Sequence, residues 1–117
     1  MKKLTWYKIA DVAGELHFPA SGLMEMEVGG KKICLANRGD QLHACAAKCP
    51  HAGGAMAAGY VDAVGNIVCP LHRYKFSLQN GRNVSGEGYF LKTYVVEHRA
   101  DGIFVGIEEN NMLSWLK

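Results

Sequence analysis

Hydrophobic and polar residues alternate in several short segments of the chain, and this alternation predicts β-strands. In residues 24–28 the apolar side chains of Met24, Met26 and Val28 alternate with two glutamates. A two-residue period places the apolar side chains on one face of a strand and the acids on the other. The pattern therefore predicts a strand with one buried face.

Residues 31–38 and 42–46 continue this pattern beyond short turns. Gly29-Gly30 separates the first predicted strand from the second, and Gly39-Asp40 separates the second from the third. Tight turns of this kind are typical of strands that pair with their sequence neighbours. We expect the three strands to form an antiparallel meander.

The clearest hairpin lies near the end of the chain. Residues 90–98 are rich in Tyr, Val and Thr, and Asp101-Gly102 precedes alternating apolar positions that begin at Ile103. No segment has a sustained helical period, although the apolar residues of the tail, 112–116, fit one or two helical turns. Short strands with frequent turns predict an all-β fold, a small sandwich or barrel.

The middle of the chain, residues 48–82, differs from both flanks in its shorter apolar runs and its many glycines. We expect it to form a small, loop-rich subdomain, because functional loops are commonly carried on a rigid support. The support would be a β scaffold of residues 1–47 and 83–110, followed by a short tail at 111–117. The whole chain, 1–117, is predicted to be one domain.

Composition narrows the possible functions. Hydrophobic residues make up 49% of the chain and charged residues 21%, as in ordinary globular proteins, and the net charge of +2 does not suggest nucleic-acid binding. No segment approaches the roughly 20 apolar residues that span a bilayer, and the N-terminal segment lacks the apolar run of a secretory signal. We expect a soluble cytoplasmic protein with no membrane span and no nucleic-acid partner; the sequence does not define its oligomeric state.

Two segments of the middle region each pair a cysteine with a histidine. Cys49-Pro50-His51 is followed, after 17 residues, by Cys69-Pro70-Leu71-His72. Two thiolates and two imidazoles satisfy a tetrahedral zinc ion, but structural zinc sites usually group like ligands. A 2Fe-2S cluster with two cysteines on one iron and two histidines on the other accounts for the mixture. The spacing favours the cluster and leaves zinc as an alternative.

This arrangement resembles the C-x-H and C-x-x-H motif of the Rieske family. Gly53, Met56 and residues 59–61 occupy positions where the family has a glycine, an apolar residue and a glycine-hydrophobic stretch, and residues 76–81 resemble its F-x-x-x-x-G turn. The resemblance extends from about residue 6 to residue 108. It implies a β sandwich or barrel with a smaller cluster-binding subdomain, and one 2Fe-2S cluster as the cofactor.

By this resemblance, Cys49 and Cys69 would bind the inner iron, and His51 and His72 the outer iron. Neutral imidazoles in place of thiolates raise the reduction potential above that of an all-cysteine cluster. The chain lacks the additional loop cysteines of high-potential members, and Phe76 stands where these have a hydrogen-bond donor. The resemblance is therefore to the low-potential ferredoxin branch, and also to nitrite reductase small subunits.

The resemblance implies a one-electron carrier that is not itself catalytic. Its partners would be a flavin- or NAD(P)H-dependent reductase and a terminal oxygenase or reductase. One alternative is a Rieske-type small subunit of a larger enzyme such as nitrite reductase, and another is a zinc-stabilised binding module without a redox role. Arg73-Tyr74-Lys75 replaces the small residue that many relatives have after the second histidine. This segment either shields the cluster or recognises an acidic partner, or its charges are simply solvated while Tyr74 packs on the loop.

The remaining cysteines and histidines have simpler interpretations. Cys34 and Cys45 are expected to be buried thiols, since free cysteine is among the most buried residue types. The three histidines outside any ligand pattern, His17, His43 and His98, are expected to be surface or core residues. Of the three, His43 is the strongest candidate for an additional ligand.

Overall fold

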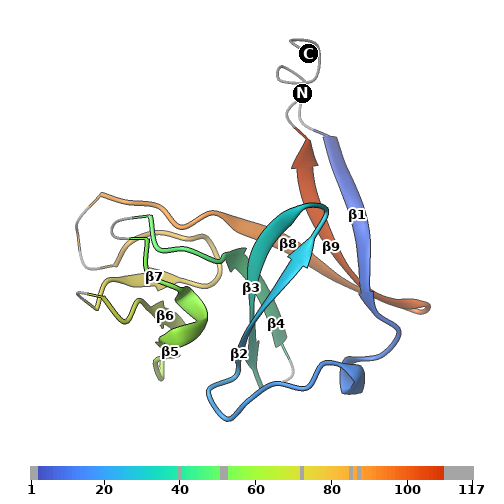
Figure 1. The fold of residues 1–117 in the computed structure, drawn as a ribbon, viewed down its shortest axis with the longest axis horizontal. Helices are drawn as coiled ribbons and strands as arrows, with labels where there is room; N and C mark the ends of the chain where they lie inside the picture. The colour runs from blue at the N-terminus through green and yellow to red at the C-terminus, as the bar shows by residue number, and fades with distance from the viewer. Residues whose placement is uncertain are drawn as a thin grey trace.

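The computed structural model describes residues 3–39, 41–50, 53–71, 73–84, 86 and 88–109. Its secondary structure consists of strands and two short 3-10 turns (Figure 1). In chain order these are β1 (Lys3–Ala10), η1 (Ala13–Glu15), β2 (Leu23–Val28), β3 (Lys31–Arg38), β4 (Gln41–Ala46), η2 (Met56–Ala58), β5 (Tyr60–Val61), β6 (Asn66–Val68), β7 (Lys75–Ser77), β8 (Thr93–Arg99) and β9 (Gly102–Glu109). The tail at 112–116, for which helical turns were predicted, lies outside the described residues.

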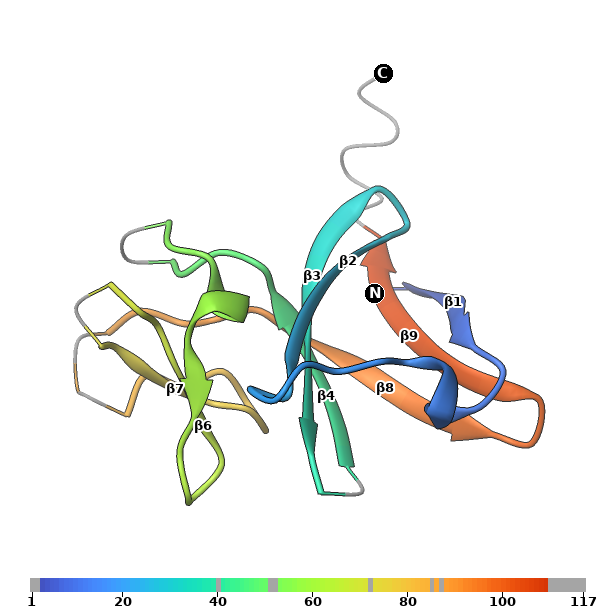
Figure 2. The same cartoon turned by 60° about the horizontal axis from the view of Figure 1, so that its bottom comes forward.

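The strands form two antiparallel sheets of different size. A curled six-stranded sheet has the order β1-β9-β8-β4-β3-β2, and a three-stranded sheet has the order β5-β6-β7. The small sheet lies to one side of the large one in both views (Figures 1 and 2). The all-β fold predicted from the alternating pattern is confirmed. Among the described residues no helix is long and apolar enough to cross a membrane.

The predicted meander is present as β2, β3 and β4. Residues Met26 and Ile33 are opposite each other in the first pair of strands, and Cys34 and Cys45 in the second. The glutamates of β2 are exposed, whereas Met24 and Met26 on the other face are half-buried and Val28 is buried, as the two-residue period predicts. Leu23 departs from this pattern, because it shares the face of the glutamates but is buried in the hydrophobic cluster of the small sheet. In β3 the four residues 33–36 are all buried, because this strand has apolar neighbours on both faces.

The C-terminal hairpin is confirmed, but its first strand begins at Thr93 rather than at residue 90. The segment before Thr93 bonds to a different part of the chain, since the backbone N–H of Leu91 donates to the carbonyl of Gly81 at 2.9 Å. Strand β9 is then covered on its other edge by β1, with Trp6 opposite Gly106. Strand β1 was not predicted from the sequence, and its burial pattern lacks a clear two-residue period.

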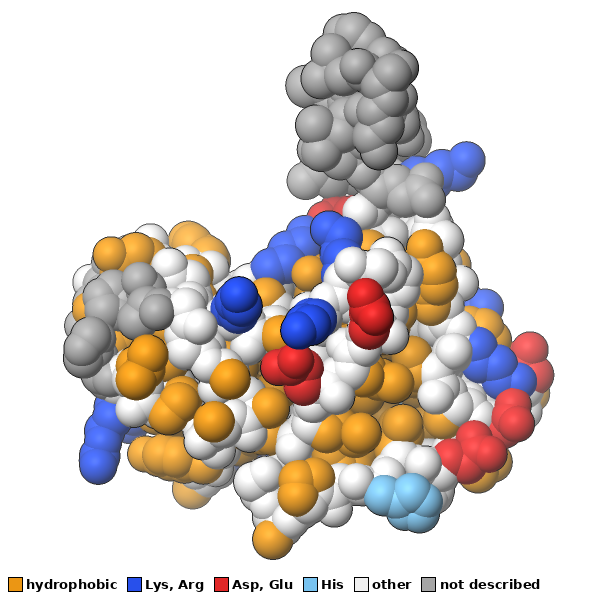
Figure 3. Space-filling view, in the orientation of Figure 1, with side chains coloured by type: hydrophobic (Ala, Val, Ile, Leu, Met, Phe, Trp, Pro, Cys, Tyr) orange, Lys and Arg blue, Asp and Glu red, His pale blue; other side chains and the backbone are white. Residues whose placement is uncertain are grey.

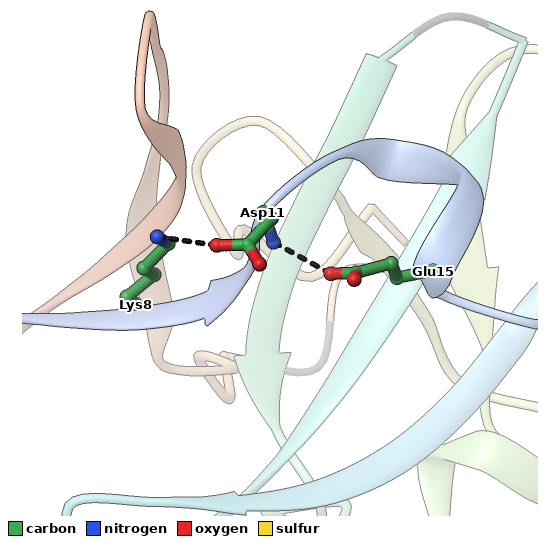
Figure 4. Close-up of polar contacts among 3 residues, drawn as sticks. All are labelled: Lys8, Asp11 and Glu15. Carbon is green, nitrogen blue, oxygen red and sulfur yellow. Dashed lines mark hydrogen bonds and ion pairs between the residues drawn. The ribbon is translucent and has the colours of Figure 1, made fainter.

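The chain then turns sharply from β1 into η1. Figure 4 shows Lys8 paired with the carboxylate of Asp11, whose backbone N–H donates to Glu15 Oε1 at 2.7 Å. The Lys8 and Asp11 side chains are largely exposed, so the ion pair contributes little to stability. The contacts serve mainly to define the direction of the turn.

Two hydrophobic clusters lie on opposite faces of β3. Cys34 and Ala36 belong to the cluster that also contains the buried residues of the small sheet, such as Ile67 and Phe76. Ile33 and Leu35 belong to the other cluster, which packs against β9. One strand therefore connects the small sheet to the hydrophobic core of the large one.

Gly81 is a position where this connection depends on a close backbone approach. Its φ is +77°, and a Cβ there would lie 1.9 Å from the carbonyl oxygen of Leu91. Gly30 has a similar φ of +81° with nothing within 4 Å of a Cβ. We expect Gly30→Ala to lower the free energy of unfolding by about 1 kcal/mol, the cost of the left-handed backbone. Gly81→Ala should lower it considerably more, because the two segments must also separate.

Urea denaturation of the two variants and the unsubstituted protein measures this difference. Equal losses for Gly81→Ala and Gly30→Ala would contradict the close approach of residues 81 and 91.

Candidate metal centre

The first cysteine-histidine segment forms a closed loop after β4. The backbone N–H of Cys49 donates to the carbonyl of Gly54 at 2.8 Å, and the N–H of Gly53 donates to the carbonyl of Cys49 at 2.8 Å. Gly53 has a φ of +73°, a conformation that glycine adopts without strain. A further bond from the N–H of Met56 to the carbonyl of Ala47 closes the loop at its base. These bonds hold Cys49 at the point where the loop leaves the core.

The second segment forms the connection between β6 and β7. Cys69 follows β6 directly, and its backbone N–H donates to the carbonyl of Tyr74 at 2.9 Å. This bond closes a loop at the end of the hairpin, to which the described residues Pro70, Leu71 and Arg73 belong. Each segment therefore has its cysteine at the base of a loop supported by backbone hydrogen bonds.

The two loops lie against one another. A Cβ placed on Gly54 of the first loop would lie 3.0 Å from the Leu71 side chain and 3.4 Å from Cys69 Sγ. Gly59, just after η2, lies against the end of β6 and the start of the second loop, since a Cβ there would lie 1.8 Å from the carbonyl oxygen of Val68 and 3.3 Å from Pro70 Cδ. Glycines at these two positions allow the loops to come together.

This approach brings the thiols of Cys49 and Cys69 into contact. Cys49 is 2% exposed and Cys69 0%, and both belong to the hydrophobic cluster that joins the two sheets. Burial raises the pKa of the Cys69 thiol, and its hydrogen-bonding contact with Cys49 raises it further. Two convergent, buried thiols are a donor set suited to iron or zinc, whose binding replaces the thiol protons.

His51 and His72, the other two predicted ligands, lie outside the described residues. Among the residues that are described, no three His, Cys, Asp or Glu side chains converge on a single point. The structure thus brings together Cys49 and Cys69, and the two histidines remain predictions from the sequence.

Cys34 and Cys45 form a second pair of thiols in the same cluster. They are directly opposite each other across β3 and β4 and are completely or almost completely buried. Contact with the Cys34 thiol, together with burial, raises the pKa of the Cys45 thiol. The prediction that these residues are core thiols is confirmed, and their cross-strand pairing was not foreseen.

The other histidines lie elsewhere. His43 is half-buried beside a small cavity of about 110 Å³ that is also lined by Arg38 and Gln41, and burial, then the charge of Arg38, lower its pKa. His17 and His98 are exposed. In the described part of the chain none of the three joins a metal-binding group.

The residues after the second loop differ in their surroundings. Phe76 is completely buried and has no hydrogen to donate to a sulfur atom. Tyr74 is half-buried against the same hydrophobic cluster, and its ring centroid lies 6.0 Å from that of Tyr89.

Comparison with protein families and curated proteins agrees with these features. The family model described as the Rieske [2Fe-2S] domain matches residues 5–94. The 3-phenylpropionate/cinnamic acid dioxygenase ferredoxin subunit of Escherichia coli K12 is 31% identical over 78 residues, which cover 66% of this chain and 74% of the relative.

Solved structures show the same fold. The ferredoxin of carbazole 1,9a-dioxygenase from Nocardioides aromaticivorans IC177 has a TM-score of 0.72 and 22% identity, covering 86% of this chain and 96% of its own. A protein from Mycobacterium tuberculosis described as an NADH-dependent nitrite reductase small subunit has a TM-score of 0.76 and 20% identity, covering 90% and 96%.

Substitution of single cysteines separates ligands from core thiols. Cys69→Ala should abolish retention of iron and sulfide, because one of the two convergent thiols is lost. Cys45→Ala removes an equally buried thiol from the same hydrophobic cluster of side chains, and this variant should retain both iron and sulfide. Iron and acid-labile sulfide assays on the two purified variants test this. Full retention in Cys69→Ala would remove Cys69 from the ligand set.

Proposed function

Because the chain belongs to the Rieske [2Fe-2S] domain family, we propose that it is a soluble, cytoplasmic one-electron carrier. It would take electrons from a flavin- or NAD(P)H-dependent reductase and pass them to a terminal oxygenase or reductase. The observation that supports a metal centre best is the contact between two buried thiols, Cys49 and Cys69, at the bases of two adjoining loops. The 31% identity with a dioxygenase ferredoxin subunit supports the role of carrier.

The cofactor of the chain is one 2Fe-2S cluster. This answers the choice between iron and zinc that the ligand pattern left open. The cluster supplies one-electron oxidation and reduction. Our assignment places Cys49 and Cys69 on the inner iron and His51 and His72 on the outer iron. It also takes residues 48–82 as the cluster-binding subdomain and residues 1–47 and 83–110 as its scaffold.

The described residues support this role by holding and shielding the thiols. The hydrophobic side chains around Cys49 and Cys69 exclude water from the two thiols. The completely buried ones include Met56, Ile67 and Phe76. The backbone hydrogen bonds of both loops fix the positions of the two cysteines before a metal is bound. Cysteines that are positioned in advance in this way would hold a cluster without rearrangement of the two loops.

The environment also supports a low potential within the family. Hydrogen bonds to the sulfurs of a cluster stabilise its more negative, reduced state. Phe76 cannot make such a bond, and no additional cysteine is present in either loop to clamp the two together. We therefore place the chain in the low-potential ferredoxin branch.

Metal content and spectroscopy test the proposal as a whole. Protein purified without oxygen should contain two irons and two acid-labile sulfides per chain, and should show an electron paramagnetic resonance signal only after reduction. One zinc per chain without sulfide, in protein produced with ample iron, would overturn it.

The histidine ligands are tested by a change of charge at the outer iron. His72→Cys should retain a cluster with a potential lower by on the order of 100 mV, because a thiolate adds negative charge where a neutral imidazole was bound. His98→Asn, at an exposed position of β8, should leave the potential unchanged. Protein-film voltammetry measures both. An unaltered potential in His72→Cys would exclude His72 as a ligand.

The alternative of a reductase subunit makes a different prediction about partners. A free carrier should accept electrons from a ferredoxin reductase as an isolated chain, whereas a subunit should require the rest of its enzyme. Reduction of the isolated protein by NADH and a purified ferredoxin reductase, followed at the visible absorbance of the cluster, distinguishes the two.

A further inference from the structure

Arg73 has an unusual backbone conformation on the second loop. Its φ is +55°, and it is the only residue other than glycine with a positive φ among those described. The left-handed region disfavours residues that have a Cβ, so glycine at this position would relieve strain. A strained residue beside a proposed cluster ligand is a reason to look for a function of its side chain.

The Arg73 side chain is directed to solvent rather than to an internal partner. The residue is exposed, and the ion pairs of the described residues do not include it. Internal stability therefore gives no reason for an arginine where a glycine would be less strained.

Exposed apolar side chains adjoin this loop. Leu71, two residues before Arg73, is 46% exposed, and Tyr89, whose ring lies beside that of Tyr74, is 40% exposed. Figure 3 shows hydrophobic side chains gathered on the lobe that carries β5, β6 and β7. We call Leu71, Arg73 and Tyr89 the loop patch.

Positive charge is concentrated in the same part of the chain. Residues 48–82 contain four basic residues and one acidic residue, whereas the rest of the chain contains nine basic and ten acidic residues. The one acidic residue, Asp62, lies in the turn between β5 and β6, where its carboxylate accepts the N–H groups of Val64 and Asn66. Glu87, near Tyr89 in the sequence, lies outside the described residues.

We propose that the loop patch docks an acidic surface of the electron-transfer partner, with Arg73 as a principal contact. This inference rests on the proposed function and specifies the chemistry of the partner. Arginine and aromatic residues contribute a large share of binding energy at protein interfaces. A positive charge beside exposed apolar side chains attracts an acidic surface over a distance and repels a basic one.

The experiment uses two redox proteins of opposite charge as probes. The cluster-loaded, reduced protein is mixed in a stopped-flow instrument with acidic plastocyanin or with basic cytochrome c. In each reaction one electron leaves the reduced protein and reduces copper(II) to copper(I) or haem iron(III) to iron(II). The plastocyanin reaction should become faster as ionic strength is lowered, whereas the cytochrome c reaction should become faster as salt is added.

Variants locate the effect and separate it from folding. Arg73→Gly should slow the plastocyanin reaction about threefold at low ionic strength, yet raise the thermal midpoint by about 4 °C because strain is relieved. Arg73→Lys retains the charge and should retain most of the rate. Lys31→Gln, at the exposed start of β3, removes the same charge from a remote position and should have little effect.

The outcomes distinguish docking from the proposed function. An equal plastocyanin rate in Arg73→Gly and the unsubstituted protein, or an equal loss in Lys31→Gln, would overturn the docking proposal while leaving the carrier role intact. If the protein contains no cluster, the carrier role fails, and docking is then read from direct titration of the purified protein with plastocyanin. Binding that weakens in Arg73→Gly but not in Lys31→Gln would still support the loop patch, and unchanged binding would overturn it.

Discussion

The contact between the bases of two loops, within one hydrophobic cluster, is the feature on which the rest of the structure depends. Cys49 begins one loop and Cys69 the other, and glycines at 54 and 59 remove the side chains that would keep the loops apart. Burial gives the thiols a fixed, water-free position, and β3 connects that position to the core of the large sheet. The large sheet can therefore be regarded as a support for two loops.

Much of this arrangement follows from local patterns. The alternation in residues 24–28 correctly predicts a strand, because a strand with one buried face alternates apolar and polar residues. The Asp101-Gly102 turn correctly predicts a hairpin, because a tight turn requires particular residues. The pairing of Cys34 with Cys45 could have been found in the same way, since the two positions are equidistant from the Gly39-Asp40 turn.

Other features depend on contacts between distant segments and leave no such mark. Strand β1 is held by its pairing with β9 at the opposite end of the chain, and its own residues show no clear period. The late start of β8 depends on the bond between Leu91 and Gly81. At the metal centre the motif identifies all four predicted ligands, whereas the structure adds the contact of the two thiols and the strained backbone of Arg73.

The role that we propose requires two cysteines and two histidines of this chain to bind one 2Fe-2S cluster. Pulsed electron paramagnetic resonance of the reduced protein, prepared with histidine labelled with nitrogen-15, tests this requirement. We expect couplings from two histidine nitrogens, one of which is lost when His51 is replaced by cysteine and the other when His72 is replaced. A cluster without coupling to labelled histidine would exclude both residues as ligands.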